Sequence, residues 1–195
     1  LEPSAGNVSF FKILPIHKRI GIDIHPKCND IKQLDFFDYK PFINKLYITV
    51  GNPPFGKISS LAVRFFNYAA SFSNVIAFIV PRTFKRVSIQ NKLCMNFHLI
   101  HSSDLPMKPC CFEPPMQAKC CFQIWIKKPV LRQKVIYNAL HSDFNFLKFG
   151  PKDINKQPTP PDGAHFVIKA YGSNCGEIKV NNLHTLRPKS WHWIT

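Results

Sequence analysis

Short apolar runs alternate with segments of helical spacing along the first two thirds of the chain. The runs at residues 19–24, 46–50 and 75–80 are rich in β-branched and other apolar side chains, which predicts buried strands. Between residues 60 and 72, apolar side chains recur every three to four positions, which predicts a helix with one buried face. These side chains are Leu61, Phe65, Tyr68, Ala69 and Phe72.

The same alternation continues to about residue 128. Residues 88–97 are predicted as a helix, and residues 99–102 and 120–126 as short strands. At the start of the chain, residues 1–3 are predicted as the end of an extended segment, followed by a small-residue turn and a short helix. Strands that alternate with helices indicate an α/β fold with an open, doubly wound and mostly parallel sheet.

The pattern changes after residue 128. Residues 157–163 are rich in Pro and Gly, residues 165–170 are typical of a strand, and a turn follows. We therefore predict a catalytic domain over residues 1–128 and a small C-terminal module over residues 129–195, with some β structure and a role in substrate recognition. Because the chain begins without Met inside its first predicted strand, we expect part of the catalytic domain to lie upstream.

Positive charge dominates the composition. The chain has 26 Lys and Arg against 11 Asp and Glu, a net charge of +15, which favours a polyanionic partner such as nucleic acid. A basic surface that serves only solubility is the alternative. No apolar run approaches the roughly 20 residues that span a bilayer, and no signal peptide opens the chain. We expect a soluble intracellular protein of the cytoplasm, nucleoid or nucleus that does not bind membranes.

The seven cysteines predict neither a disulfide framework nor a metal site. Their number is odd, and the adjacent pairs at 110–111 and 120–121 lack the C-x-x-C spacing of metal ligands. Reduced thiols are the prediction, and a zinc site built from these pairs and nearby histidines is the alternative. The eight histidines form no H-E-x-x-H or Ser/His/Asp pattern.

Three polar segments follow predicted strands, at the strand ends where open α/β sheets bind ligands. Residues 2–6 follow the first strand, Asp23 ends the second, and residues 52–56 follow the fourth. An acid at the end of the second strand suits the two ribose hydroxyls of a nucleoside cofactor. The first loop lacks G-x-G-x-x-G, so a dinucleotide cofactor is disfavoured.

The tetrapeptide Asn52-Pro53-Pro54-Phe55 is the most specific of these signals. Its prolines fix the backbone and lack N–H donors, which leaves the Pro53 carbonyl and the Asn52 amide oxygen free to face one ligand amine. The exocyclic amine of adenine fits, because two acceptors would orient its hydrogens while Phe55 stacks on the base. An ordinary proline-rich turn with Phe55 in the core is the alternative.

Four motifs in this order resemble the amino-methyltransferases that act on adenine. They are E-P-S-A-G at 2–6, G-I-D-I at 21–24, D-F-F at 35–37 and N-P-P-F-G at 52–56. The resemblance covers about residues 1–128. It implies a Rossmann-like class I methyltransferase fold with a seven-stranded sheet, and S-adenosylmethionine as the methyl donor.

The resemblance also implies which residues bind the cofactor. The first motif would line its methionine side through Glu2, Pro3, Ala5 and Gly6. The second and third motifs would bind its nucleoside, with Asp23 at the ribose, Ile24 and Phe36 beside the adenine, and Asp35 at the adenine amine. The family usually has a second glycine where this chain has Val8, whose side chain would crowd the cofactor or tighten the start of the following helix.

The target base is held by the fourth motif if the resemblance carries over. Its catalytic residues would be Asn52, Pro53, Pro54 and Phe55, and no covalent nucleophile is required. Adenine in a duplex must first be extruded, or the enzyme must act on an unpaired strand. Three cations follow the strand predicted at residues 75–80, namely Arg82, Lys85 and Arg86. They would hold the nucleic-acid backbone. A solvated basic loop is the alternative.

The leading hypothesis is therefore transfer of a methyl group from S-adenosylmethionine to the N6 amine of adenine in DNA. The same chemistry on RNA is one alternative, and a catalytically inactive nucleic-acid-binding module with the same fold is another. A nicotinamide-dependent oxidoreductase ranks last, because its glycine-rich loop is absent.

Near the end of the chain, Trp191 and Trp193 are predicted to pack in a core, with a platform for bases as the alternative.

Overall fold

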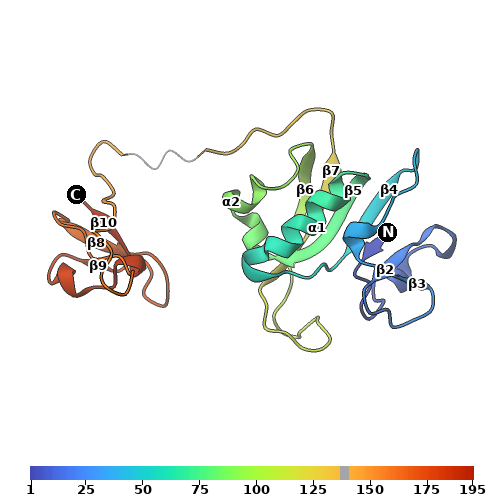
Figure 1. Cartoon of the computed structure of the whole chain (residues 1–195), viewed down its shortest axis with the longest axis horizontal. Coiled ribbons are helices and arrows are strands. Elements are labelled where there is room, and N and C mark those ends of the chain that lie inside the picture. Colours follow the sequence, from blue (N-terminus) through green and yellow to red (C-terminus); the bar gives the residue numbers. More distant parts are fainter. Residues whose placement is uncertain (137–140) are drawn as a thin grey trace. The chain divides into compact units, whose positions relative to one another are not determined.

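The computed structural model describes residues 1–136 and 141–195 (Figure 1). These residues form two compact units, Leu1–Val135 and Ile136–Thr195. The module predicted over residues 129–195 includes residues 137–140, which lie outside the described residues, and its role in recognition stays a prediction. No helix in the described parts of the chain is long and apolar enough to cross a membrane.

The strands of the first unit form two sheets. The first sheet is parallel and has the order β1-β2-β3, with β1 at Glu2–Pro3, β2 at Gly21–Asp23 and β3 at Ile31–Gln33. The second has the order β4-β5-β7-β6, with β4 at Tyr47–Gly51, β5 at Ser73–Pro81, β6 at Phe97–Asp104 and β7 at Cys120–Lys127. Strand β7 is antiparallel to both of its neighbours, and β4 and β5 are parallel.

Strand β1 is bonded on both sides. The backbone N–H of Glu2 donates to the carbonyl of Ile20 at 2.8 Å, on the side of β2. On the other side, the amine of Leu1 donates to the Ile48 carbonyl at 2.7 Å, and the N–H of Val50 donates to the Leu1 carbonyl at 2.9 Å. The three-stranded sheet therefore stands beside β4 of the four-stranded sheet, with β1 between β2 and β4.

The expected mixed α/β architecture is present, but the helices differ from the prediction. Helix α1 (Ser60–Ala70) confirms the helical spacing of that segment and packs its apolar face toward β5 (Figure 1). Between β1 and β2 the chain forms only the 3-10 turns η1 (Phe11–Ile13) and η2 (Ile16–Lys18), because Pro15 lacks the N–H that a continuous helix needs. The described residues between β1 and β3 contain no α-helix, so the doubly wound arrangement is incomplete.

The helix predicted over residues 88–97 is wrong beyond its first turn. Helix α2 covers only Val87–Gln90. The Asn91 side chain bonds both backbone groups of Val135, and the Asn67 side chain accepts from the Cys94 N–H at 2.8 Å. The Cys94 N–H, which a longer helix would have used, is thereby satisfied by a side chain.

The remaining short helices are 3-10 turns in loops. They are η3 (Phe36–Asp38), η4 (Lys57–Ser59), η5 (Arg82–Lys85), η6 (Leu183–Thr185) and η7 (Pro188–Ser190). Aromatic rings fill the core of the first unit. The ring of Phe66 on α1 lies 5.4 Å from that of Trp125 on β7 and 5.7 Å from that of Phe97 on β6. A smaller apolar cluster contains Ala5, Val8, Phe11 and Ile31.

The second unit has an antiparallel sheet with the order β10-β8-β9. Its strands are β8 (Phe166–Lys169), β9 (Ile178–Lys179) and β10 (Trp191–Ile194). Trp191 and Trp193 are buried around Val167, so the expectation that they pack in a core is confirmed. The predicted strand at 165–170 is β8, whereas β9 and β10 were not predicted.

A buried hydroxyl pair between β4 and β5 tests this packing. Thr49 Oγ1 and Ser73 Oγ lie 2.6 Å apart and both residues are fully buried. Ser73→Ala leaves the Thr49 hydroxyl without a partner and should lower the free energy of unfolding by about 1–3 kcal/mol, whereas Thr49→Val with Ser73→Ala should cost less than Ser73→Ala alone. Urea denaturation measures both, with the exposed neighbour Asn74→Ala as control. A double variant that is less stable than Ser73→Ala would contradict this account.

Candidate functional site

The loops that follow β1 and β4 meet at one cavity. Its volume is about 410 Å³, within the range of small-molecule sites. Its walls come from the loop after β1, from Asn52 after β4, from Ile79 on β5 and from the loop between β6 and β7. Of the predicted site residues, those in the lining are Glu2, Ala5, Gly6 and Asn52.

The loop after β1 is shaped by backbone bonds to β2. The N–H groups of Ser4 and Ala5 both donate to the Ile22 carbonyl, at 2.8 and 2.9 Å, and the N–H of Gly6 donates to Asp23 Oδ2 at 2.8 Å. Ser4 and Gly6 have left-handed φ angles of 75° and 47°. The Ser4 hydroxyl reaches the Asn52 carbonyl at 3.5 Å, which links this loop to the loop after β4.

Two residues that line this cavity each have a buried acceptor atom without a partner. In the part of the chain that the structure describes, Glu2 Oε2 and Asn52 Oδ1 are the buried side-chain nitrogen or oxygen atoms that make no hydrogen bond. Leaving such a group unpaired costs about 1–3 kcal/mol, so native proteins rarely do it without a reason. Both residues line the same cavity, which indicates a ligand that brings two hydrogen-bond donors.

Burial controls the charge of Glu2. The residue is 2% exposed, and this burial raises the pKa of its carboxyl from 4.5 to about 7, against a smaller opposite effect of a backbone hydrogen bond from Phe11. The approach of β4 is close here, since a Cβ placed on Gly51 would lie 3.3 Å from Glu2 Cγ. Near neutral pH the Glu2 carboxyl is therefore divided between its protonated and ionised forms, and a cationic donor bound beside it would favour the ionised form.

The fourth motif begins at the cavity and then turns away from it. Asn52 lines the cavity, whereas Pro53, Pro54 and Phe55 are not among its lining residues. Pro53 is buried, Pro54 exposed and Phe55 half-buried. The turn ends at Gly56, with a φ of 67°, where a Cβ would stand only 2.7 Å from the Cβ of Leu61. Glycine is thus required where the loop enters α1.

Residues predicted to hold the cofactor nucleoside lie outside this cavity. The carboxylate of Asp23 accepts from the N–H groups of Gly6 and His25, both at 2.8 Å, and so fixes the loop after β1. Asp35 accepts from the N–H of Phe37 at 2.9 Å and caps η3. Their predicted contacts with the cofactor stay predictions.

The two apolar residues of the predicted nucleoside site differ in exposure. Phe36 is 2% exposed and packs in the core, with its ring 5.1 Å from the ring of Phe65 on α1. Ile24 is exposed at the end of β2. Ile24 is accessible to a ligand in this arrangement, whereas Phe36 serves the core.

Val8 does not crowd the cavity. Its side chain is buried in the small cluster with Phe11 and Ile31, and Val8 is not among the lining residues. Its φ of 59° is left-handed, a conformation that a β-branched residue rarely adopts. The backbone here has the geometry that glycine would allow, and the packing of the valine side chain holds it there.

Sequence reasoning missed the loop between β6 and β7. This loop lines the cavity through residues 111–114, and the Glu113 carbonyl accepts from the Asn7 side chain at 3.2 Å. The prolines between the two predicted strands indicate a long loop. They do not indicate which strand ends this loop covers. Cys110 and Cys111 in this loop are exposed free thiols.

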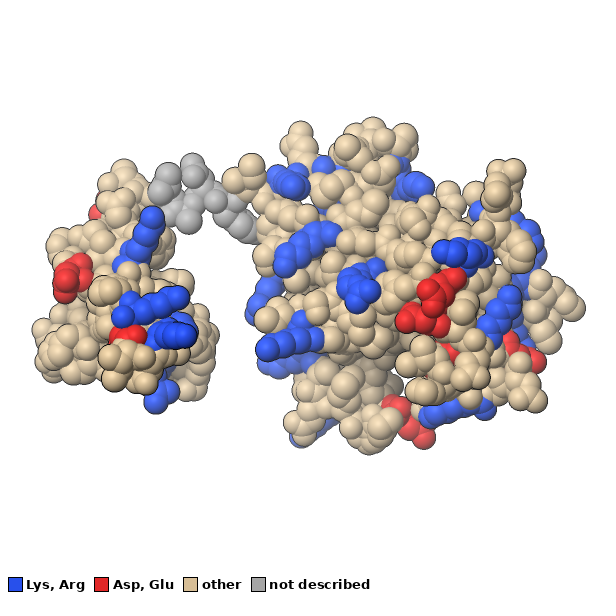
Figure 2. Space-filling model, viewed as in Figure 1, with Lys and Arg blue, Asp and Glu red and all other residues tan. Residues whose placement is uncertain are grey.

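The predicted nucleic-acid-binding cations lie at the end of β5 but are partly neutralised. Asp104 pairs with Arg82 at 3.4 Å and with Lys85 at 2.5 Å, and Arg86 is exposed. Arg82 also donates to the Leu105 carbonyl at 3.2 Å, which anchors the start of the β6–β7 loop. Lys and Arg are spread widely over the visible face of the first unit (Figure 2).

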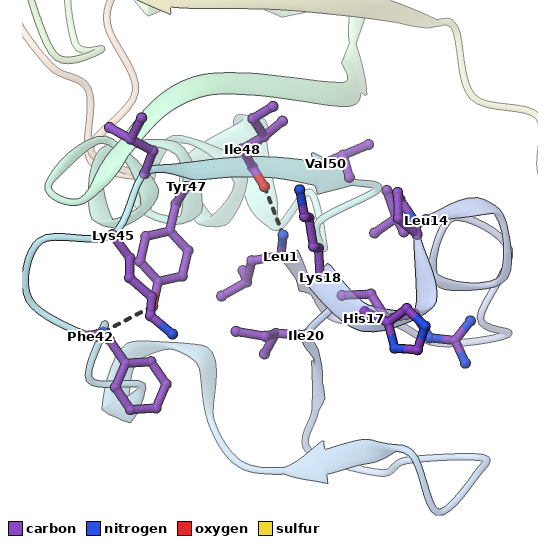
Figure 3. A pocket seen from close by; sticks show the side chains of 13 residues that line it. Leu1, Leu14, His17, Lys18, Ile20, Phe42, Lys45, Tyr47, Ile48 and Val50 are labelled. Carbon is purple, nitrogen blue, oxygen red and sulfur yellow. Dashed lines mark hydrogen bonds between the residues drawn. The ribbon is translucent and has the colours of Figure 1, made fainter.

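A second cavity of about 590 Å³ lies at the opposite, amino ends of the strands (Figure 3). Leu1, Ile20 and Ile48 form part of its apolar wall. Three cations and a histidine also line it; these are Lys18, Arg19, Lys45 and His17. None of the predicted site residues lines it. Although it is larger, it lies away from the strand ends where ligands of α/β sheets bind.

No metal site emerges from the described residues. Within 1–136 and 141–195, no group of three or more His, Cys, Asp or Glu side chains stands close enough to hold a metal ion. Burial raises the pKa of the Cys120 thiol to about 11, so this cysteine is a protonated core residue at neutral pH.

Comparison with known proteins gives a distant structural similarity and no match in sequence. No family model matches the chain, and no curated protein matches it in sequence. A solved structure with some likeness is the "Crystal structure of 23S rRNA methyltransferase ErmE", at 14% sequence identity and a TM-score of 0.37. The match covers 54% of this chain and 45% of the methyltransferase, so it spans less than half of that protein. A likeness this distant carries no argument about activity.

Proposed function

We propose that the chain is the catalytic part of a methyltransferase that transfers a methyl group from S-adenosylmethionine to the N6 amine of adenine in nucleic acid. The observation that carries this proposal is the pair of unpartnered acceptors, Glu2 Oε2 and Asn52 Oδ1, in one cavity at the ends of β1 and β4. The expected preference for DNA has no support among the described residues, so the proposed substrate is adenine in nucleic acid generally.

The acceptors suit the two amines of the proposed reaction. Glu2 would accept from the α-ammonium group of the cofactor, and the small residues Ala5 and Gly6 leave room beside it. S-adenosylmethionine, when bound, supplies an electrophilic methyl group. Asn52 would accept one N6 hydrogen of adenine and hold the nitrogen lone pair toward the methyl group, with the Pro53 carbonyl as the second acceptor.

Asp23 keeps capacity for the cofactor ribose. Each carboxylate oxygen has two lone-pair directions, and each oxygen of Asp23 accepts one backbone N–H. A ribose hydroxyl would therefore add to these bonds rather than replace them.

In the same proposal the two sheets form one sheet in the order β3-β2-β1-β4-β5-β7-β6, through the two bonds between Leu1 and β4.

The reaction is tested directly by its product. We expect N6-methyladenine in nucleosides from DNA or RNA treated with the chain and S-adenosylmethionine, measured by mass spectrometry, with single-stranded and duplex forms of each as separate substrates. N6-methyladenine in DNA alone, or in RNA alone, would identify which of the two nucleic acids is the substrate. If S-adenosylmethionine binds in calorimetry but no nucleic acid gains a methyl group, the substrate assignment is wrong.

Asn52 is expected to act in catalysis rather than in cofactor binding. Asn52→Ala removes an acceptor that is proposed to hold the reacting amine, so kcat should fall by about 100- to 1000-fold while the Kd of S-adenosylmethionine stays unchanged. Single-turnover assays and calorimetry measure the two quantities. The control is Asn74→Ala, which changes an exposed asparagine of β5. Wild-type turnover in Asn52→Ala would refute the proposed geometry.

Cofactor affinity should depend on pH through Glu2. Because burial holds its pKa at about 7, the carboxyl is protonated below that pH, and affinity for the cationic cofactor should fall by up to about tenfold per pH unit between pH 7 and pH 5.5. Glu2→Gln should bind weakly at every pH in calorimetry. A wild-type affinity that stays constant over this range would rule out the Glu2 carboxylate as the ammonium acceptor.

Glu2 also links the stability of the first unit to pH. Its folded-state pKa of about 7 lies above the ordinary 4.5, so its contribution to the free energy of unfolding is fully present below pH 4.5 and is lost as the pH rises through 7. Glu2→Gln should make the stability less dependent on pH across this window. Urea denaturation at several pH values checks the sign, and a wild-type stability that rises through this window relative to Glu2→Gln would contradict it.

A further inference from the structure

The strand alternation in the second unit divides its aromatic side chains between two faces of the sheet. Trp191 and Trp193 point into the core with Val167, so His192 between them points to the opposite face and is exposed. The segment before the sheet adds to that face. Phe146 bridges Ile194, and the N–H of Leu147 donates to the Trp193 carbonyl at 2.8 Å.

On this opposite face the rings form a connected row. The ring of Phe146 lies 5.7 Å from that of His192 and 5.6 Å from that of Phe144. His141 stacks on Phe144 at 4.8 Å with an interplanar angle of 8° and closes one end of the row. Phe146, at its centre, is 48% exposed.

The second unit as a whole carries a net positive charge, and the acid Asp143 lies beside His141 at one end of the row. The second unit has seven Lys or Arg against four Asp or Glu: Lys148, Lys152, Lys156, Lys169, Lys179, Arg187 and Lys189 against Asp143, Asp153, Asp162 and Glu177. Cations outnumber acids on its visible face (Figure 2). Leu147 packs in the core, so the alternation places Lys148 on the same face as Phe146, and Lys148 makes no ion pair with the described residues.

We propose that the row of Phe144, Phe146 and His192, together with Lys148, binds single-stranded nucleic acid by stacking on its unpaired bases. Aromatic side chains that are exposed or half-exposed beside a cation fit this ligand, because every base offers a planar π surface and every nucleotide a phosphate. The proposal deepens the proposed function by giving the substrate strand a second binding site. Binding there requires no methyl transfer, so the two are tested separately.

The test measures binding of the whole chain to a fluorescein-labelled 12-nucleotide strand that contains only thymine, followed by fluorescence anisotropy. Such a strand offers no adenine to the cavity of the first unit. Phe146→Leu keeps an apolar side chain but removes the ring, and should weaken binding roughly 5- to 150-fold. Phe146→Tyr should bind as the wild type. The matched control is Phe149→Leu, which removes an equally exposed ring (47%) that joins no aromatic pair among the described residues.

Two further results separate stacking from other effects. The slope of log affinity against log salt concentration should be the same for Phe146→Leu and the wild type, because the ring carries no charge. His192→Trp enlarges an exposed ring and should tighten binding several-fold, a gain that misfolding cannot produce. Wild-type binding by Phe146→Leu, or an equal loss in Phe149→Leu, would overturn the proposal. Methyl transfer to adenine-containing strands, assayed alongside, reports independently on the proposed function.

Discussion

The site depends on the hydrogen bonds that hold the two-residue strand β1 between β2 and β4. Leu1 bonds to Ile48 and Val50 on one side, and Glu2 bonds to Ile20 on the other. These bonds bring the buried carboxyl of Glu2, from one sheet, and the amide of Asn52, which follows the other, to the lining of one cavity. Glu2 Oε2 and Asn52 Oδ1 have no hydrogen-bond partner within the described chain. Each unpaired oxygen lowers the stability of the fold by about 1–3 kcal/mol until a ligand supplies a donor. The two unpaired buried acceptors distinguish this cavity from a surface depression that binds no ligand.

Much of this arrangement could be predicted from the sequence. Runs of β-branched residues located β2, β4 and β5, and the spacing from Leu61 to Phe72 located α1. The position of polar motifs after strands placed Glu2 and Asn52 near each other, because parallel strands end at one edge. Local patterns carry this information, since each depends on residues that are neighbours in the chain.

The parts that could not be predicted depend on contacts between distant residues. Helix α2 ends after one turn, and backbone groups that follow it bond to distant side chains: the Cys94 N–H donates to Asn67, and the Leu93 carbonyl accepts from Arg132. The β6–β7 loop closes the cavity through Glu113, whose contact with Asn7 spans more than a hundred positions. Phe36 has the sequence context of a cofactor contact, yet the rings of α1 take it into the core. A motif thus locates a backbone segment well, and the direction of each side chain less well.

The left-handed backbone at Val8 has a consequence for how such loops are identified. The family that the sequence resembles usually has a second glycine at this position, and glycine reaches the left-handed region at little cost. Here a valine has a left-handed φ of 59° and is buried in one cluster with Phe11 and Ile31. A search that required glycine at this position would pass over a chain like this one, whereas a search for a left-handed backbone at this position would retain it. Other chains with a bulky residue at this position are therefore worth re-examining by geometry.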